Sequence, residues 1–170
     1  MTAAVVEVIA EVGIGRTTHR AVAARAGVPL GATTYYFPTL ADLVAAGLAR
    51  AGADLDAELV RWADHLGDGL DLPARLTRLT CEYLANRSRA LTEFELYLAA
   101  ARSPELRPLA RSWRDQVRRL LTPMVGDRAA VAVAALLDGV AVQSIATGEP
   151  VDPAAVESAI TALVSGGPLR

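Results

Sequence analysis

The 170-residue sequence predicts an all-α protein, and three observations lead to that prediction. Hydrophobic residues make up 52% of the chain, mostly Ala, Leu and Val, whereas the aromatic residues typical of strands make up only 5%. Few runs alternate apolar and polar residues with the period of two that a half-buried strand needs. Capping residues, Gly and Pro divide the rest into segments of helical length.

The first quarter of the chain predicts three short helices and the start of a fourth. An apolar first helix covers residues 3–12. Thr18 is placed to cap a second helix over residues 19–26, and Gly27 to end it in the left-handed conformation. The third helix, residues 29–36, is too short to be stable without docking on its neighbours. A helix pair at this spacing is a common device for reading DNA.

The remaining three quarters of the chain predict further helices, separated by capping residues and breakers. Thr39 caps the first of them, Asp127 caps a long apolar one, and Asp152 with Pro153 opens the last. A turn is predicted at residues 67–69. The predicted helices cover residues 40–66, 73–87, 91–101, 103–123, 128–147 and 153–165.

The exposed chemistry of the helix pair suits DNA. A helix N-terminus, with free amides that attract phosphate, lies beside Thr18. The four hydroxyls of residues 33–36 suit phosphate contacts, and the start of the third helix is expected to meet base edges. Phe37 is interpreted as a core residue, whereas core and outward positions are equally favoured for Tyr35 and Tyr36. The predicted DNA-contact residues are Thr18, His19, Arg20, Pro29, Leu30, Gly31, Ala32, Thr34, Tyr35 and Tyr36.

Five features stand in a fixed order without a gap: a Thr pair, A-x-x-A-G-V, G-x-x-x-Y-Y-F, a short Pro-Thr turn and an Asp-Leu pair. They occupy residues 17–18, 23–28, 31–37, 38–39 and 42–43. This stretch resembles the N-terminal domain of the TetR family of bacterial transcriptional regulators. The resemblance implies a helix-turn-helix domain over residues 1–46 and a ligand-binding and dimerisation domain over residues 47–170. It also implies a dimeric repressor that binds a palindromic double-stranded DNA operator and responds to a small-molecule effector.

Two positions depart from the family pattern. Thr34 stands where the family often has Tyr, and Leu40 where it often has a Lys that touches phosphate. Four arginines against three carboxylates give residues 1–50 a net charge of only +1, which is weak for a DNA-binding unit. We therefore expect strong DNA binding only from a dimer. The alternative is a helical small-molecule-binding protein that has lost DNA binding, which Leu40 favours.

The predicted helix over residues 128–147 is apolar nearly all round and needs a cover on its outer side. A second copy of the chain is the simplest cover, with this helix and the last one forming a four-helix bundle across a two-fold axis. The alternative is a central helix buried inside one chain. The predicted dimer-interface residues are Val133, Leu137, Val140, Ile160 and Leu163.

Several polar and aromatic residues interrupt the apolar pattern of the later helices. One interpretation is that they line an effector pocket, in which a few polar groups orient a mainly apolar ligand. The other is that they are core residues with local hydrogen bonds. The predicted pocket residues are Tyr83, Phe94, Tyr97, Trp113 and Gln143.

The residue inventory does not favour an enzyme. The chain has two His, one Cys and no clustered metal-ligand spacing, so we predict no catalytic residue, no metal site and no cofactor. The single Cys81 fits a reducing cytoplasm. No basic, apolar leader opens the sequence, and no uninterrupted apolar run reaches the length of a membrane span. We therefore expect a cytoplasmic protein without a membrane partner.

Overall fold

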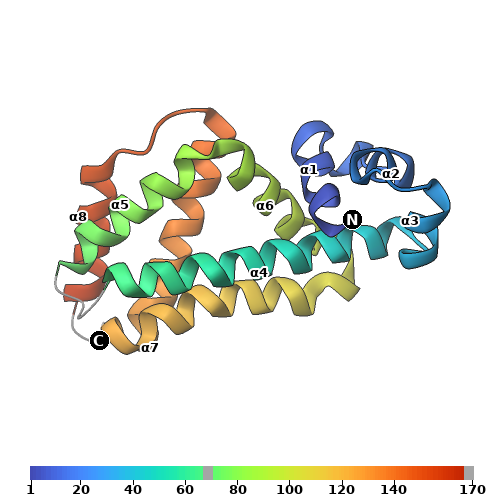
Figure 1. Ribbon diagram of the computed structural model, residues 1–170. Coiled ribbons are helices and arrows are strands. Elements are labelled where there is room, and N and C mark those ends of the chain that lie inside the picture. The colour runs from blue at the N-terminus through green and yellow to red at the C-terminus, as the bar shows by residue number, and fades with distance from the viewer. Residues whose placement is uncertain (67–70, 167–170) are drawn as a thin grey trace. The chain divides into compact units, whose positions relative to one another are not determined.

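The computed structural model describes residues 1–66 and 71–166 of the chain (Figure 1). These residues form helices joined by turns and contain no strand, which confirms the predicted all-α fold. The turn predicted at residues 67–69 lies outside the described residues. The elements in chain order are α1 (Thr2–Val12), η1 (Ile14–Arg16), α2 (His19–Ala26), α3 (Leu30–Tyr36), α4 (Leu40–Leu66), α5 (Leu72–Ala85), α6 (Arg87–Ala99), η2 (Pro104–Leu106), α7 (Arg107–Thr147) and α8 (Pro153–Ser165).

Helix α6 begins four residues earlier than the sequence predicted. The side-chain oxygen of Asn86 accepts a hydrogen bond from the backbone amide of Arg89 at 3.2 Å, so Asn86 acts as an N-cap. The prediction missed this cap because Asn86 follows α5 directly and was placed near the end of that helix. A single residue therefore separates α5 from α6.

Helix α7 contains the break that the sequence placed near residue 126. Gly126 has φ 78° and ψ 161°, values outside the helical region, so the helix is kinked there. The guanidinium of Arg118, before the kink, donates hydrogen bonds of 2.6 and 2.9 Å to the carboxylate of Asp127, after it. The residues expected to form two helices thus form two segments joined at a glycine.

The described residues divide into two compact units. Unit 1 consists of residues 1–55 and 91–113, and unit 2 of the described residues within 56–90 and 114–170. Helices α4, α6 and α7 each contribute residues to both units. The predicted boundary between residues 46 and 47 divides the DNA-binding part from the ligand-binding part, and it does not coincide with the division into compact units. It stays a prediction.

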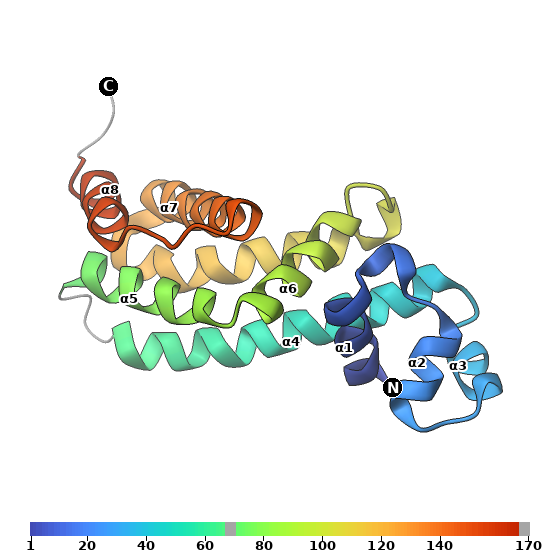
Figure 2. The same cartoon turned by 90° about the horizontal axis from the view of Figure 1, so that it is seen from above.

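Unit 1 has a hydrophobic core. Side chains from α1, α2, the first turns of α4 and the second half of α6 pack together in it. Figure 2 shows α1, α2 and α3 gathered around the start of α4. A Cβ atom at Gly47 would lie 3.0 Å from Val5 and 3.4 Å from Leu96, so the close approach of these helices requires a glycine. The largest side chains fully buried in this core are Val5, Ile9, Val22, Leu43, Leu48, Leu96 and Leu106.

Unit 2 has its own core, in which α5 and α8 lie side by side (Figure 1). The end of α4 and both segments of α7 contribute to it. Its largest fully buried side chains are Leu66, Leu76, Leu121, Val133 and Ile160. Asp152 caps α8 as predicted, because its carboxylate accepts from the amides of Ala154 and Ala155.

Helix α7 contains an unusually apolar stretch. By length and composition alone the helix could cross a membrane, although its apolar residues are interrupted by polar ones. Core helices of globular domains meet the same criterion, and Ala130 and Val133 of α7 belong to the core of unit 2. Only 17% of the most apolar 18-residue window is buried within the chain, however. Part of the helix, including Val131 and Val142, is therefore open to solvent.

Candidate DNA-binding surface and effector pocket

The turn between α2 and α3 is built as the sequence predicted. The Thr18 hydroxyl accepts from the amide of Ala21 at 3.2 Å and caps α2. Gly27 ends the helix with φ 66° and ψ 31°, in the left-handed region. The amide of Val28 then donates to the carbonyl of Ala23 at 3.0 Å, which turns the chain toward α3.

Helix α3 has seven residues and is anchored by a buried threonine. The Thr33 side chain is 0% exposed, and its hydroxyl donates to the carbonyl of Leu30 at 2.8 Å. The prediction that Thr33 offers its hydroxyl to DNA was therefore wrong, because this position faces the core. Phe37, at the end of the helix, is half-buried and packs against the core of unit 1, as expected.

Both tyrosines of α3 point outward. Tyr35 is 79% exposed and Tyr36 is 63% exposed, and their rings meet edge to face with centroids 5.2 Å apart. The sequence left core and outward positions equally open for this pair, and neither ring lies in the core. Eight of the ten predicted DNA-contact residues are exposed, namely Thr18, Arg20, Pro29, Leu30, Gly31, Thr34, Tyr35 and Tyr36, whereas His19 and Ala32 are half-buried.

A reciprocal pair of hydrogen bonds starts α4. The Thr39 hydroxyl accepts from the Asp42 amide at 3.1 Å, and the Asp42 carboxylate accepts from the Thr39 amide at 2.9 Å. This capping box satisfies two amides of the exposed helix end. Leu40, the departure from the family pattern, lies between them and is 45% exposed.

Most arginines of the first 50 residues are occupied within the chain. The Arg25 guanidinium pairs with Glu11 and Glu7, and their carboxylates raise its pKa. Arg50 pairs with Asp54 at 2.9 Å. Arg20 makes no ion pair with any of the residues that the structure describes, and it lies exposed in the first turn of α2. The cationic charge available to phosphate is thus smaller than the sequence count of arginines.

A residue far along the chain fixes the turn after α1. The backbone amide of Ile14 donates to the carboxylate of Glu95 on α6 at 3.2 Å. Gly13 precedes it with φ 77°, and a Cβ atom there would lie 3.7 Å from the same carboxylate. The helix-turn-helix thus depends for its support on a side chain from a later part of the sequence.

The five predicted effector residues are divided between the two units. Tyr97 and Trp113 meet in unit 1, with ring centroids 5.7 Å apart, whereas Tyr83 lies in unit 2 beside the guanidinium of Arg89. Phe94 is half-buried in unit 1. Gln143 lines a pocket in unit 2, and none of the other four lines that pocket. These effector assignments remain predictions.

Two buried polar groups in unit 2 escaped the sequence analysis. Thr77 Oγ1 and Gln116 Oε1 are buried and have no hydrogen-bond partner among the described residues. An unsatisfied buried polar atom is costly unless a ligand or water supplies the missing bond. The available signal was a polar residue at helical spacing from apolar ones. Cys81 and Leu84 follow Thr77 by four and seven positions, and Trp113 and Leu120 stand three before and four after Gln116.

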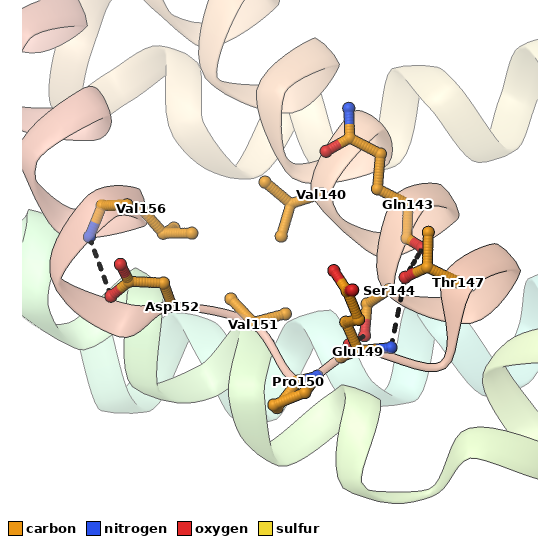
Figure 3. Close-up of a pocket in the computed structure, with 10 residues that line it drawn as sticks. Val140, Gln143, Ser144, Thr147, Glu149, Pro150, Val151, Asp152 and Val156 are labelled. Atoms are coloured by element: carbon orange, nitrogen blue, oxygen red, sulfur yellow. Dashed lines mark hydrogen bonds between the residues drawn. The ribbon is translucent and has the colours of Figure 1, made fainter.

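The pocket that includes Gln143 lies where α7 ends and α8 begins (Figure 3). Its volume is about 360 Å³. Glu149 and Asp152 supply the acidic groups, and Val140, Val151 and Val156 much of the apolar surface. Figure 3 shows the Glu149 carboxylate rising from the turn toward Val140, whereas the Asp152 carboxylate is directed toward the start of α8.

The structure corrects part of the predicted dimer interface. Val133 is 1% exposed, Leu137 8% and Ile160 0%, so these side chains fill the core of their own chain and leave no surface for a partner. Val140 and Leu163 are half-buried. The sequence could not indicate which face of α7 points outward, because a helix that is apolar all round gives no signal for its outward side. The exposed face of α7 instead carries Val131, Ala135, Asp138, Val142 and Ala146.

Comparison with known proteins extends the resemblance over nearly the whole chain. The family model "Bacterial regulatory proteins, tetR family" matches residues 2–46, and "Tetracyclin repressor-like, C-terminal domain" matches residues 71–166. A comparison with curated proteins gave no match.

Among solved structures, the multidrug binding protein EbrR in complex with imidazole is 38% identical, with a TM-score of 0.88 over 99% of this chain and 95% of that one. A member of the TetR family from Streptomyces coelicolor A3 is 39% identical, with a TM-score of 0.84 over 96% and 95%. A transcriptional regulator from Rhodococcus sp. Rha1 is 26% identical, with a TM-score of 0.75 over 96% and 91%.

Proposed function

Because the chain belongs to the TetR family of bacterial regulatory proteins, with a DNA-binding N-terminal domain and a ligand-binding C-terminal domain, we propose that it is a dimeric repressor. Two copies bind a palindromic operator, and a small organic effector releases them. The protein acts in the cytoplasm, where its operator lies. Members of this family are regulators rather than enzymes.

The exposed aromatic face of α3 is the observation that carries the DNA-binding part of the proposal. Tyr35 and Tyr36 leave large ring surfaces in solvent, which a folded domain gains nothing by exposing. Their hydroxyls and that of Thr34 suit phosphate oxygens, while Gly31 lets the backbone approach the groove closely. The free guanidinium of Arg20 adds a phosphate contact at the N-terminus of α2.

The uncovered face of α7 supports the dimer. Val131, Ala135, Asp138, Val142 and Ala146 follow one another at intervals of three or four residues and form one stripe along the helix. A two-fold axis beside this stripe covers it on both copies at once. A dimer also doubles the weak positive charge of one helix-turn-helix and offers two units to half-sites that lie about 34 Å apart, one turn of DNA.

The effector is a small organic molecule. The 38%-identical EbrR was solved with ethidium, with proflavin and with malachite green, and this chain shares its fold over nearly its whole length. A ligand that binds one arrangement of the two reading units better than the other shifts the population and changes operator affinity.

The test is a gel-shift titration of the full chain against the DNA upstream of its own gene, with a shuffled duplex of equal length as control. We expect a specific complex that weakens steeply between about 50 and 200 mM salt. Equal affinity for the two duplexes rejects the repressor and favours a helical small-molecule-binding protein that has lost DNA binding.

A further inference from the structure

We infer that the pocket between the end of α7 and the start of α8, called here the turn pocket, binds a small organic cation that carries an apolar group. Gly148 and Glu149 form the turn at which the pocket opens. As a binding site the turn pocket stands on its own geometry, whereas its role as an effector site rests on the proposed function.

The wall of the turn pocket is held in place by its own side chains. Gly148 turns the chain with φ 78°, and its amide donates to the carbonyl of Ser144 at 3.0 Å. The Ser144 hydroxyl donates to the carbonyl of Glu149 at 2.8 Å, and the Glu149 amide donates to the Thr147 hydroxyl at 3.1 Å. The backbone that presents Glu149 is therefore preorganised, which lowers the entropy lost on binding.

Negative charge dominates the turn pocket. The Glu149 carboxylate makes no hydrogen bond or ion pair with any residue that the structure describes, and no residue lining the pocket is basic. The negative end of the α7 dipole points toward the same region. The guanidinium of Arg87 donates to the carbonyls of Ser144 and Ile145 and offsets part of that helix-end charge, so the unpaired Glu149 carboxylate is the main attraction for a cation.

The helix that starts at the turn pocket does not offset this charge. The N-terminus of α8 carries partial positive charge and would attract an anion if its amides were free. Asp152 occupies two of those amides with its own carboxylate, at 3.0 Å to Ala154 and 3.3 Å to Ala155. An anion would thus meet two carboxylates, whereas a cation meets an unpaired one.

The remaining lining determines the shape of the ligand. Val140, Val151 and Val156 present methyl groups beside the Glu149 carboxylate (Figure 3). A simple metal ion would gain nothing from these side chains, whereas an aryl or alkyl group attached to an ammonium centre would bury apolar surface against them. The volume of about 360 Å³ admits one such ring.

The test maps amide shifts in the ¹⁵N-labelled full chain during titration with benzyltrimethylammonium. Benzenesulfonate, an anion of similar size, is the control ligand. For a ligand of about eleven non-hydrogen atoms we expect a Kd of about millimolar, with shifts concentrated in residues 140–156. Glu149→Gln keeps the shape of the side chain and should weaken binding about fivefold. Glu157→Gln removes the same charge from α8 outside the turn pocket and should leave binding unchanged.

Three outcomes overturn the inference: no shifts with the cation, equal shifts with benzenesulfonate, or unchanged cation binding in Glu149→Gln. The last two would mean that the unpaired carboxylate does not select the ligand. Operator titration of the same preparations separates this inference from the proposed function. Operator binding without cation binding rejects only the turn pocket, whereas cation binding without operator binding rejects only the repressor.

Discussion

The backbone amide of Ile14 donates to the carboxylate of Glu95 at 3.2 Å, although 81 positions separate the two residues in the sequence. Ile14 belongs to the stretch matched by the N-terminal family model and Glu95 to the stretch matched by the C-terminal one, yet both lie in unit 1. The turn that leads from α1 toward α2 is thus held by a helix of the ligand-binding domain.

Removing that carboxylate should destabilise unit 1. Glu95→Ala leaves the partly buried Ile14 amide without its acceptor, and we expect a loss of about 1–3 kcal/mol in the free energy of unfolding, measured in urea. Glu95→Gln retains a carbonyl oxygen and should lose less. Glu157→Ala, on the exposed face of α8, is the matched control; an equal loss in both alanine variants would show that the contact contributes nothing.

Shortening the exposed side chains of α3 should weaken DNA binding without affecting assembly. Thr34→Ala and Tyr36→Ala each remove a hydroxyl placed for phosphate, and we expect operator affinity to fall about threefold to tenfold. Gel-shift titration measures the affinity, and sedimentation shows whether the dimer persists. Thr161→Ala, at an exposed position of α8, is the control for the loss of a hydroxyl group. Wild-type affinity in both α3 variants would remove these residues from the DNA-binding surface.

The capping box of α4 should contribute measurably to stability. Thr39→Ala removes the hydroxyl that accepts from the Asp42 amide, and we expect a loss of about 1 kcal/mol, measured as a shift of the urea midpoint. Thr39→Ser keeps the oxygen and serves as the control. If the serine variant lost as much as the alanine variant, the cap would not be the cause.

A charge on the uncovered face of α7 should separate the proposed dimer. Val142 is 43% exposed and lies on the stripe that a second copy would cover. Val142→Glu should give a monomer in sedimentation at concentrations where the wild type is a dimer, because the interface would bury a second carboxylate four positions after Asp138. Val60→Glu is the matched control, since Val60 is 65% exposed on α4. A dimer in both variants would place the interface elsewhere.

The single cysteine should react slowly with alkylating reagents. Burial raises the pKa of the half-buried Cys81 thiol, and the charge of Glu82 raises it further. At neutral pH the thiol is therefore almost entirely protonated, and the thiolate is the reactive form. We expect iodoacetamide to modify native Cys81 measurably more slowly than free cysteine at pH 7.5, with the difference lost in urea. A native rate equal to that of free cysteine would contradict this.

Local sequence signals correctly predicted where several helices begin and end. Thr18, Gly27, Thr39 and Asp152 act through hydrogen bonds or backbone conformations within a few residues, so their roles can be read without knowing the fold. Asn86 obeys the same rule but was hidden by the helix before it. The orientation of Thr33 could not be read in this way, because a threonine has no intrinsic preference for the core.

The all-α fold, the helix-turn-helix and the family can be predicted from the amino-acid sequence alone, because caps, breakers and helical periodicity are local. The buried face of the apolar α7 cannot, since a helix that is apolar all round is oriented by its neighbours. The ion pairs of Arg25 with Glu7 and Glu11, and the contact of Glu95 with Ile14, also become visible only in the folded chain. Each joins residues at least 14 positions apart in the sequence, and packing fixes such contacts. Gln143 likewise lines its pocket only because α7 and α8 meet at a turn.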